Sequence, residues 1–550
     1  MPVTTSYPGV YIEELPSANH SVTPAPTSVT VFIGYTNPFW QAAPAATPPP
    51  FGAAVELFSF ADYQAYFGGF FTSPFLLDYV GQAVFQFFMN GGSNAYVVAL
   101  QAGNYFDQTK VPPANDTGKK VLPAQAALGT SANGFTFTAL QPVGLAGPPA
   151  VGLAMTLTVS NIITVTTTND TADLTIVYGT TVETYRRVAI ADIATTVNAR
   201  SALAVVTPKG TLPTDYSSVA ASASFTYSAV PTDGWTISDP TAFAPVFAAN
   251  APLDKVSIFN LMVLPGLTDT TALAEALAYC ESKRAFFIMD PPATAVADSL
   301  AARLPDAPPN PAPMADIWNG TASNSPVTPA PPVSANGAIY FPYLQTTDLV
   351  TGAPASSPPS GFVAGIFARE DNNRGVWKSP AGLETTILGT NGVVPSGKMT
   401  DPQQGVLNML GVNCLRTFPG IGSVVFGAHT LVFENPAYEQ WKYVAVRRMA
   451  LFLEQSLYGS LGWAIFEPND IPLWNALTQE IQAFMLGLFR QGAFQGATAD
   501  QAFHVQCDST TTSQADIDNG VVNILVAFAP LKPAEFVVVQ IAQLAGQTQS

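Results

Sequence analysis

Two short motifs carry residue types that could do chemistry. The first, GVVPSGKM at residues 392–399, has the GxxxxGK spacing of a phosphate-binding loop, in which backbone amides and a lysine hold a nucleotide. The position that should supply a hydroxyl for magnesium is Met399, and Pro402 predicts that no helix follows the loop directly. Without a helix N-terminus the loop lacks its row of amide donors, so the sequence argues against an ATP site.

The second motif, His504-x-x-Cys507, contains two possible zinc ligands. The remaining cysteines and histidines do not complete a zinc spacing, and residues three apart on a strand face opposite sides. Asp290 precedes two prolines at the end of an expected strand, where active sites of α/β proteins lie. We favour the alternative, a turn-forming aspartate, and expect no catalytic residues, no cofactor and no metal.

The composition indicates a large protein with few charges. The 550 residues suffice for two to four domains, each with its own core. Charged residues make up 11% of the chain, against about 25% in average proteins, and 48% is hydrophobic. This is typical of a polymer subunit that is covered by its neighbours, although an acidic secreted protein is the alternative. No apolar run reaches the roughly 18 residues of a membrane helix, so we expect no membrane insertion.

Charge and cysteine content exclude several classes of partner. The net charge is −17 and no lysine or arginine precedes Lys110, which argues against binding to nucleic acid or an anionic membrane. Cys280, Cys414 and Cys507 are an odd number without motif spacing, so we expect a reducing compartment. The N-terminus has neither a basic nor an apolar signal region, so we expect no secretory signal.

Apolar β-forming runs alternate with helical segments on both sides of a long middle region, which predicts a largely parallel sheet. The fold class is therefore α/β (α+β) with several domains, and residues 21–100 and 241–400 supply this part. The expected strands are residues 28–36, 90–100, 255–266, 284–292 and 338–345, and the expected helices are residues 76–89, 270–283 and 293–303.

Between residues 101 and 240 the composition changes to threonine, valine and alanine. Apolar and polar residues alternate in MTLTVSNIITVTT (155–167) and again in residues 172–190. Period-two alternation between Asn-Asp turns predicts a β-rich inserted domain.

Residues 401–550 are expected to form a further domain, with a glycine-punctuated strand region, two long helices at residues 438–457 and 473–489, and a return strand. The first helix is apolar almost all round, which predicts packing on most sides. A narrow face with Arg447, Glu454 and Gln455 is expected to be wet. The second helix is expected to begin after Asp470, an N-cap residue, with Pro472 in its first turn.

Residues 1–20 are expected to form an arm. YPGVYIEE at residues 7–14 combines a Pro-Gly turn with a short β-favouring run. Pro16, Pro24 and Pro26 keep the following chain extended. Such a segment has no core of its own, so its amides must be satisfied by water or by another sheet.

Several words of this sequence resemble those of contractile-tail sheath proteins, which form the outer tube of contractile phages, R-type pyocins and extracellular injection systems. Between residues 407 and 541 they are, in order, LNMLGVN, VRRMALFLEQSL, FEPND, QGAFQG, AFHVQCD and VAFAPLKPAEFVVVQI. PGVYIEE near the N-terminus, FMNGGSNAYVV at residues 88–98 and the stretch 358–382 also match. Phe426 and His429 differ from the family word WGARTL, where Trp and Arg are usual.

The resemblance implies a structural protein and not an enzyme. The implied function is that of a sheath subunit that polymerises helically, as stacked hexameric rings, around an inner tube and contracts to drive the tube through a target cell envelope. The implied partners are further copies of the chain, the inner tube protein, and baseplate and tail terminator or cap proteins. Assembly would take place in the bacterial cytoplasm, as part of a phage tail or tail-like particle that can be released.

The resemblance also implies roles for particular residues. Residues 401–550 would face the inner tube, with Arg447 and Glu454 in a charged contact or in an internal ion pair, and the insertion would lie outside. Terminal strands would be donated to neighbouring subunits by Val10, Tyr11, Ile12, Glu13 and Glu14, and by Phe536, Val537, Val538 and Val539. The second hypothesis, an acidic α/β hydrolase or NTPase with a β-rich accessory domain, predicts globular particles instead of hollow tubes.

Overall fold

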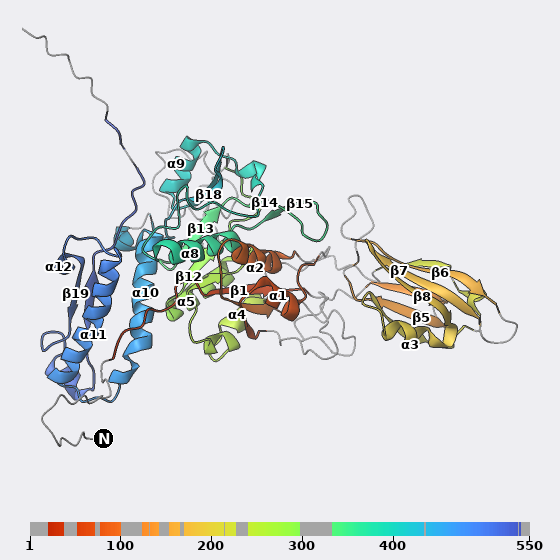
Figure 1. Cartoon of the computed structure of the whole chain (residues 1–550), viewed down its shortest axis with the longest axis horizontal. Helices are drawn as coiled ribbons and strands as arrows, with labels where there is room; N and C mark the ends of the chain where they lie inside the picture. The colour runs from red at the N-terminus through yellow and green to blue at the C-terminus, as the bar shows by residue number, and fades with distance from the viewer. Residues whose placement is uncertain are drawn as a thin grey trace, which may run out of the picture. The chain divides into compact units, whose positions relative to one another are not determined.

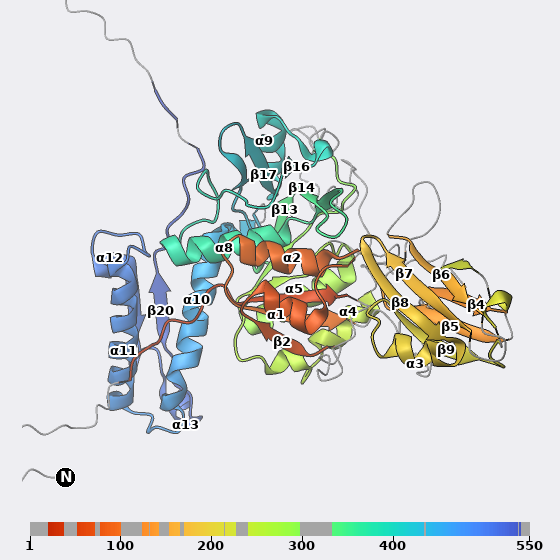
Figure 2. The ribbon, with the colours of Figure 1, turned by 45° about the vertical axis from the view of Figure 1, so that its right-hand side comes forward.

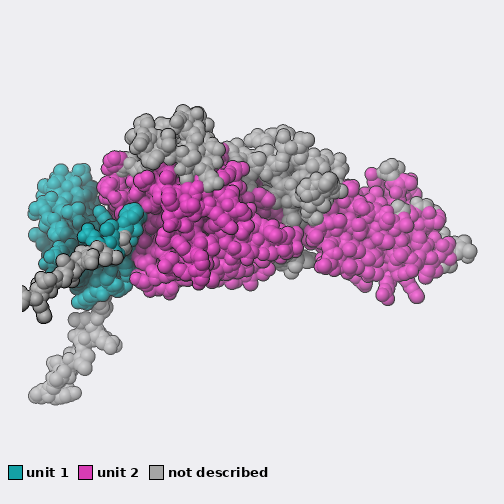
Figure 3. Space-filling view, turned by 90° about the horizontal axis from the view of Figure 1, so that it is seen from above, with its two compact units in different colours: residues 1–26, 375–377, 448–550 teal, residues 27–374, 378–447 magenta. Residues whose placement is uncertain are grey.

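The structure is a computed structural model that describes residues 20–37, 52–71, 77–100, 124–130, 133–141, 143, 153–164, 170–213, 215–219, 221–226, 240–297, 333–433, 436–536 and 538–540. The chain divides into two compact units, which Figure 3 colours separately. The first unit contains Gly375–Trp377, Arg448–Ser550 and the chain up to Pro26. The second contains Thr27–Arg374 and Lys378–Arg447.

The second unit is built on an eight-stranded sheet with the order β18-β17-β13-β12-β11-β1-β3-β2. Its central strands, from β17 to β3, are parallel, and the edge strands β18 and β2 are antiparallel to their neighbours. The predicted largely parallel sheet is therefore confirmed. The strands are β1 (Thr30–Tyr35), β2 (Ala54–Leu57), β3 (Ala95–Leu100), β11 (Leu261–Val263), β12 (Phe286–Met289), β13 (Gly337–Phe341), β17 (Asn413–Phe418) and β18 (Gly422–Phe426).

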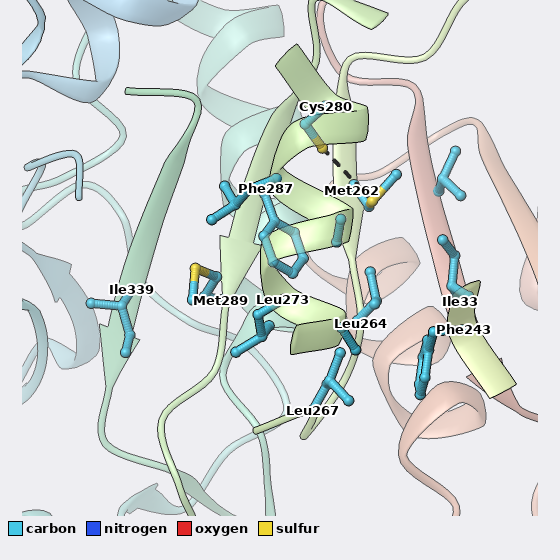
Figure 4. Close-up of a cluster of buried hydrophobic side chains, with 14 of the residues drawn as sticks. Ile33, Phe243, Met262, Leu264, Leu267, Leu273, Cys280, Phe287, Met289 and Ile339 are labelled. Carbon is cyan, nitrogen blue, oxygen red and sulfur yellow. Dashed lines mark hydrogen bonds between the residues drawn. The ribbon is translucent and has the colours of Figure 1, made fainter. Parts of the chain in front are cut away.

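Helices cover both faces of this sheet (Figures 1 and 2) because successive residues of a strand point to opposite sides. Ile33 of β1 belongs to a core that includes residues of α4 (Pro240–Phe247) and α5 (Thr270–Lys283). Figure 4 shows this core, with Ile33 near Phe243 and Leu264. The next residue back, Phe32, meets Phe87 of α2 (Tyr79–Met89), with ring centroids 5.5 Å apart.

On the second face, α2 packs closely against α8 (Ser360–Arg374). A Cβ atom at Gly361 would lie 2.5 Å from the Cα of Ala83, and one at Gly365 would lie 2.6 Å from the Cβ of Asn90. Only glycine allows the two backbones to approach this closely.

Local sequence signals predicted several of these elements well. The expected helix at residues 270–283 is α5, and its N-cap Asp269 accepts hydrogen bonds from the amides of Thr271 and Ala272, both at 2.9 Å. The helix expected from residue 76 begins at Tyr79, because Asp78 caps it through the amide of Gly81. The helix expected at residues 293–303 extends outside the described residues.

Two expected strands differ in extent. Residues 255–266 contain only the three-residue strand β11, after a 3-10 helix, η3 (Pro252–Lys255). The strand expected at residues 338–345 is divided into β13 and β14 (Leu344–Thr347), and β14 belongs to a separate sheet with the order β15-β14-β16. The other two strands of that sheet are β15 (Pro354–Ser357) and β16 (Gly392–Val393).

The middle region forms its own β-structure with its own core. One sheet has the order β4-β5-β9 and the other the order β10-β6-β7-β8. Their inward residues include Phe137, Leu157 and Leu174, each fully buried. The elements are β4 (Gln125–Gly129), β5 (Gly134–Ala139), β6 (Met155–Ile163), β7 (Thr171–Tyr178), β8 (Thr181–Ala189), α3 (Ile193–Asn198), β9 (Ala204–Lys209) and β10 (Ser222–Ser224).

The first unit contains the two long helices and the return strand. α10 (Val444–Ser460) continues into this unit from the second, and α11 (Ile471–Arg490) follows the N-cap Asp470 with a proline in its first turn, as predicted. Met449, Leu453 and Ile481 are buried in its core. β19 (Phe503–Gln506) is the expected return strand and pairs with β20 (Leu525–Phe528). Among the described helices, none combines the length and apolarity that a membrane span requires.

The start of α10 and the boundary of its domain differ from expectation. The helix was expected from residue 438, but Pro436–Trp441 form a 3-10 helix, η5, and Tyr443 is held in a bridge with His429. Tyr443 is also the last residue before the helix, since its carbonyl accepts the first helical hydrogen bond from the amide of Arg447 at 3.1 Å. The bridge holds Tyr443 in an extended conformation, so α10 starts at Val444. The expected domain of residues 401–550 is divided at Arg447, because β17 and β18 belong to the large sheet.

Asp290 joins three loops at the C-terminal edge of the large sheet. The carboxylate is 1% exposed and accepts hydrogen bonds from the amide of Gly266 at 2.9 Å, the amide of Ser360 at 2.8 Å and the hydroxyl of Ser360 at 2.6 Å. Burial raises the pKa of Asp290 to about 6, although these hydrogen bonds act in the opposite direction. The interpretation of Asp290 as a structural aspartate is consistent with this geometry.

The raised pKa predicts how Asp290 contributes to stability as the pH changes. Its folded pKa of about 6 lies above its ordinary value of 3.8. The contribution is therefore fully present below about pH 4 and is lost as the pH rises through about 6. We expect the difference in unfolding free energy between the wild type and Asp290→Asn to fall by up to roughly 3 kcal/mol over this interval. Urea unfolding of both proteins at each pH measures it, and a difference that stays constant or rises would contradict the assignment.

The separate core of the inserted β-structure predicts that the rest of the chain folds without it. We expect a chain in which residues 101–240 are replaced by a short Gly/Ser linker to be soluble and to retain cooperative unfolding, because loss of a self-contained core leaves the other contacts intact. Circular dichroism and thermal unfolding test this. An insoluble product would show that the insertion shares a core with the large sheet. Phe137→Ala in the full chain is the control, and it should destabilise the insertion by about 3–5 kcal/mol.

Candidate functional site

The GxxxxGK stretch does not form a phosphate-binding loop. A helix, α9 (Asp401–Met409), does follow it, and the prediction that Pro402 prevents this is wrong because the first turn of a helix tolerates proline. The amide of Thr400 donates to Oε1 of Gln403 at 2.8 Å in a capping box. That helix N-terminus is therefore already capped within the protein, by the side chain of Gln403.

The amides of the loop are also used within the protein. The amide of Val394 donates to the carbonyl of Tyr343 at 3.1 Å, and that of Gly397 donates to Val394 at 2.9 Å. The amide of Lys398 donates to the carbonyl of Pro395 at 3.3 Å. A phosphate cradle needs amides that point together at the ligand, and these three do not, so the geometry supports the sequence argument against a nucleotide.

The two possible zinc ligands differ in exposure. His504 is exposed on β19, whereas Cys507 is buried just beyond its end. Burial raises the pKa of the Cys507 thiol, which disfavours the thiolate that a metal requires. Within the described part of the chain, no three histidine, cysteine or acidic residues are grouped so that they could hold a metal.

Arg447 has a structural contact that the sequence did not indicate. Its Nε donates to Oδ1 of Asn336 at 2.9 Å, and its guanidinium carbon lies 4.9 Å from the ring centroid of Trp441. Asn336 is itself buried and donates from Nδ2 to the carbonyl of Ala285 at 3.0 Å. The expected wet face is therefore only partly correct, since Arg447 is half-buried and turned toward the second unit's own loops.

The other two residues of the face that was expected to be wet also differ in exposure. Glu454 is exposed, whereas Gln455 is 8% exposed. His429, which stands in place of the family's usual arginine, is fully buried and stacks on Phe433 with ring centroids 3.6 Å apart. An aromatic pair thus fills the place where a charged side chain was usual, and Glu454 is the exposed charge on α10.

The strands β19 and β20 form a small antiparallel sheet, with Phe503 opposite Phe528 and Gln506 opposite Leu525. In the described residues this sheet has two strands, so each has one backbone edge that is not paired in it. Of the expected C-terminal strand, the described residues 536 and 538–540 are paired in no strand of this chain. Phe536, Val538 and Val539 are 80%, 82% and 75% exposed, and Val537 lies outside the described residues, as do Val10, Tyr11, Ile12, Glu13 and Glu14.

Ser456 and Ser460 of α10 make contacts with residues 20–26 that the sequence did not indicate. Each hydroxyl accepts a hydrogen bond from a backbone amide in residues 20–26. The available signals were a pair of serines four residues apart on α10 and, far away in the sequence, a segment in which prolines alternate with donor residues.

Two protein-family models match the chain. The phage tail sheath protein central domain matches residues 249–431, and the phage tail sheath C-terminal domain matches residues 437–543. Together they cover more than half of the chain. The two matches are separated by residues 432–436, and the two compact units divide after Arg447.

Curated relatives with similar sequences are also sheath proteins. A putative prophage major tail sheath protein of Pseudomonas aeruginosa (strain UCBPP-PA14) is 28% identical over 197 residues, which is 35% of this chain and 48% of that protein. The tail sheath protein of Burkholderia phage BcepMu is 27% identical over 165 residues, which is 29% of this chain and 34% of that protein. The matched stretches thus span half or less of these relatives.

Solved structures share the fold over almost the whole chain. The PVC sheath complex of an extracellular contractile injection system, in the contracted state, has a TM-score of 0.55 at 21% identity, with 98% of this chain and 99% of that chain covered. The helical sheath of the anti-feeding prophage in the contracted state has a TM-score of 0.52 at 21% identity, with coverage of 98% and 100%. A chain of the anti-feeding prophage baseplate has a TM-score of 0.53 at 21% identity, with coverage of 98% and 99%. This likeness confirms the mixed α/β fold, and with both family models matched in order, the chain belongs to the phage tail sheath family.

Proposed function

We propose that this chain is the structural subunit of a contractile tail sheath. It polymerises helically, as stacked hexameric rings, around an inner tube and contracts to drive that tube through a target cell envelope. The observation that carries the proposal is the ordered match to the sheath central and C-terminal domains over residues 249–431 and 437–543. The alternative of an acidic hydrolase or NTPase has no support among the relatives, which are all sheath proteins.

Strand addition between subunits is the proposed basis of the polymer. A two-stranded sheet such as β19–β20 is marginal alone, and its unpaired edges are templates for further strands. The donated strands would be Val10–Glu14 of one neighbour and the apolar stretch at Phe536–Val539 of another, of which Phe536, Val538 and Val539 are exposed in the single chain. A strand added to an open edge gains affinity from main-chain hydrogen bonds.

Such strands would keep subunits attached while their bodies move. A five-residue strand makes a handful of ladder hydrogen bonds, each contributing about 1 kcal/mol net. These bonds persist when rigid units rotate about the flexible segments that carry the strands. Repetition on every subunit would hold the lattice together through contraction.

The remaining assignments follow from the same proposal. The unit with α10 and α11 faces the inner tube, with Glu454 as an exposed charge, and the inserted β-structure of residues 101–240 lies on the outside. Further partners are baseplate and tail terminator or cap proteins, and a chain of similar fold in the anti-feeding prophage baseplate supports the baseplate contact. Assembly takes place in the bacterial cytoplasm, as part of a phage tail or a tail-like particle that can be released.

The N-terminal strand can be tested with proline, which has no N–H to donate. We expect Ile12→Pro to leave a folded monomer that forms no tubes, because the substitution removes one ladder bond and its ring disturbs the pairing. Ile12→Val is the matched control, since it keeps both the amide and the β-branched side chain. Electron microscopy and sedimentation measure assembly, and normal tubes from Ile12→Pro would refute donation by this arm.

The contact with the tube can be separated from the stability of the fold. We expect Glu454→Lys to weaken assembly on purified tubes without lowering the thermal midpoint, because the residue is exposed. Glu454→Gln, which is neutral and isosteric, should assemble on tubes less well than the wild type and better than Glu454→Lys. Arg447→Glu should lower the unfolding free energy by about 1–3 kcal/mol, since it removes the contacts with Asn336 and Trp441. Unchanged co-sedimentation of Glu454→Lys with tubes would exclude Glu454 from the contact.

A further inference from the structure

Residues 20–26 are held in place although they form neither a helix nor a paired strand. The side chain of Val22 is 8% exposed and belongs to the core of the first unit, together with residues of α10 and α11. Pro24 and Pro26 have no N–H, so the donors between and before them belong to Thr23 and Ala25. Ala25 is half-buried and Thr23 is exposed. A half-buried backbone donor needs an acceptor, and residues 20–26 have no paired strand to provide one.

The acceptors are two serine hydroxyls on α10. The amide of Ala25 donates to Oγ of Ser456 at 2.9 Å, and the amide of Thr23 donates to Oγ of Ser460 at 3.0 Å. Ser456 is 1% exposed and its hydroxyl donates to the carbonyl of Phe452 at 2.7 Å. That bond orients the hydroxyl so that its lone pairs remain available to Ala25.

The two spacings match. Amides two residues apart in an extended chain are separated by about 6.6 Å, and residues four apart on a helix are separated by about 6 Å along the axis. Ala25, the later residue of the segment, pairs with Ser456, and Thr23 pairs with Ser460, which comes later on the helix. The segment therefore runs antiparallel to α10. Figures 1 and 2 show the N-terminal red segment crossing α10 toward the far end of the helix pair.

The segment ends on an aromatic contact. The ring of His20 stacks on Trp463 of η6 (Leu461–Ala464), with centroids 4.1 Å apart and an interplanar angle of 8°. The indole Nε1 of Trp463 donates to Oε2 of Glu480 at 3.0 Å, and Glu480 is buried on α11. The ring that receives His20 is therefore itself fixed by the second helix.

We propose that residues 20–26 are an anchored root of the N-terminal arm. Ser456, Ser460 and Trp463 are positioning residues that make the arm leave the chain at His20, on the first unit, and not at Thr27. This inference rests on the proposed function, because it concerns where a donated strand starts. Without the anchor, residues 20–26 would be free to move, which shifts the point of departure by up to about 23 Å. The anchor therefore selects which neighbour the arm reaches.

Hydrogen exchange of the full-length monomer tests the anchor directly. In the wild type we expect the amides of Thr23 and Ala25 to be protected. In Ser456→Ala/Ser460→Ala they should exchange about fivefold faster, the effect of one net hydrogen bond at each amide. Ser456→Thr/Ser460→Thr keeps both hydroxyls and should restore the protection. Exchange at these amides that is as fast as in a free peptide, or that is unchanged by the alanine variant, would overturn the anchor.

Ser282→Ala is a matched control. Ser282 lies on α5 and its hydroxyl also donates to a carbonyl of its own helix, that of Tyr279 at 2.7 Å. Ser282 is exposed and Ser456 is 1% exposed, so its loss should change the thermal midpoint less than loss of Ser456 does. It should leave the exchange of Thr23 and Ala25 as in the wild type, and a loss of protection in this variant would overturn the assignment to Ser456 and Ser460.

Assembly then tests the positioning role. We expect the double alanine variant to need a roughly tenfold higher concentration to form tubes, because the freed residues must be ordered again when the arm docks. An unchanged critical concentration, together with lost protection, would overturn the positioning role. If the wild type forms no tubes while its exchange pattern is as expected, the proposed function fails and the anchored root is supported.

Discussion

The pairing of β1 with strands on both of its sides is the contact on which the rest of the second unit depends. Thr30 of β1 lies opposite Ala95 of β3 on one side and opposite Leu261 of β11 on the other. The strand therefore joins sequence before the inserted β-structure to sequence after it. Parallel strands must be covered on both faces, so this pairing also requires the helix layers of α2 with α8 and of α4 with α5. The insertion can vary without disturbing that arrangement, because its inward residues form a core of their own.

At the edge where an α/β enzyme would place its chemistry, Asp290 makes structural contacts. Asp290 has the burial and the raised pKa that often mark a catalytic carboxylate. Its oxygens are occupied by the amide of Gly266 and by the amide and hydroxyl of Ser360. The same group that could act as a general base in another setting therefore holds loops together here. A shared fold does not determine a shared function, and the contacts of each polar group decide between the two.

Backbone edges and terminal segments are the chemically distinctive parts of the first unit. Its core packs α10 against α11 through apolar residues, which provides a rigid base and little surface chemistry. Main-chain donors and acceptors can bind any extended segment that reaches them, so geometry must provide specificity. A root that is held by Ser456, Ser460 and Trp463 would supply that geometry, since it limits the directions in which the arm can leave. Only 11% of the residues in the chain are charged. On such a weakly charged surface, a single exposed carboxylate such as that of Glu454 is a distinct chemical feature.

The sequence by itself determined the features that depend on neighbouring residues. The N-cap Asp470 located the start of α11, because capping is a local property. The helix expected at residues 270–283 is α5. Alternation of apolar runs with helices indicated the parallel sheet, and the ordered sheath words indicated the family. Each of these motifs consists of residues that are adjacent in sequence, so it can be recognised without knowledge of the fold.

Only the tertiary structure decided the contacts between distant segments. The start of α10 depends on the bridge between Tyr443 and His429, and Arg447 is turned inward by Asn336, which is 111 positions away. The hydroxyls of Ser456 and Ser460 accept from amides more than 400 residues earlier. The periodicity of a helix predicts which of its faces is polar. The partner of a polar group on that face depends on which other segment packs against it in the fold. No periodicity within either segment encodes that partner, so the division at Arg447 and the path of the arm root could be found only in three dimensions.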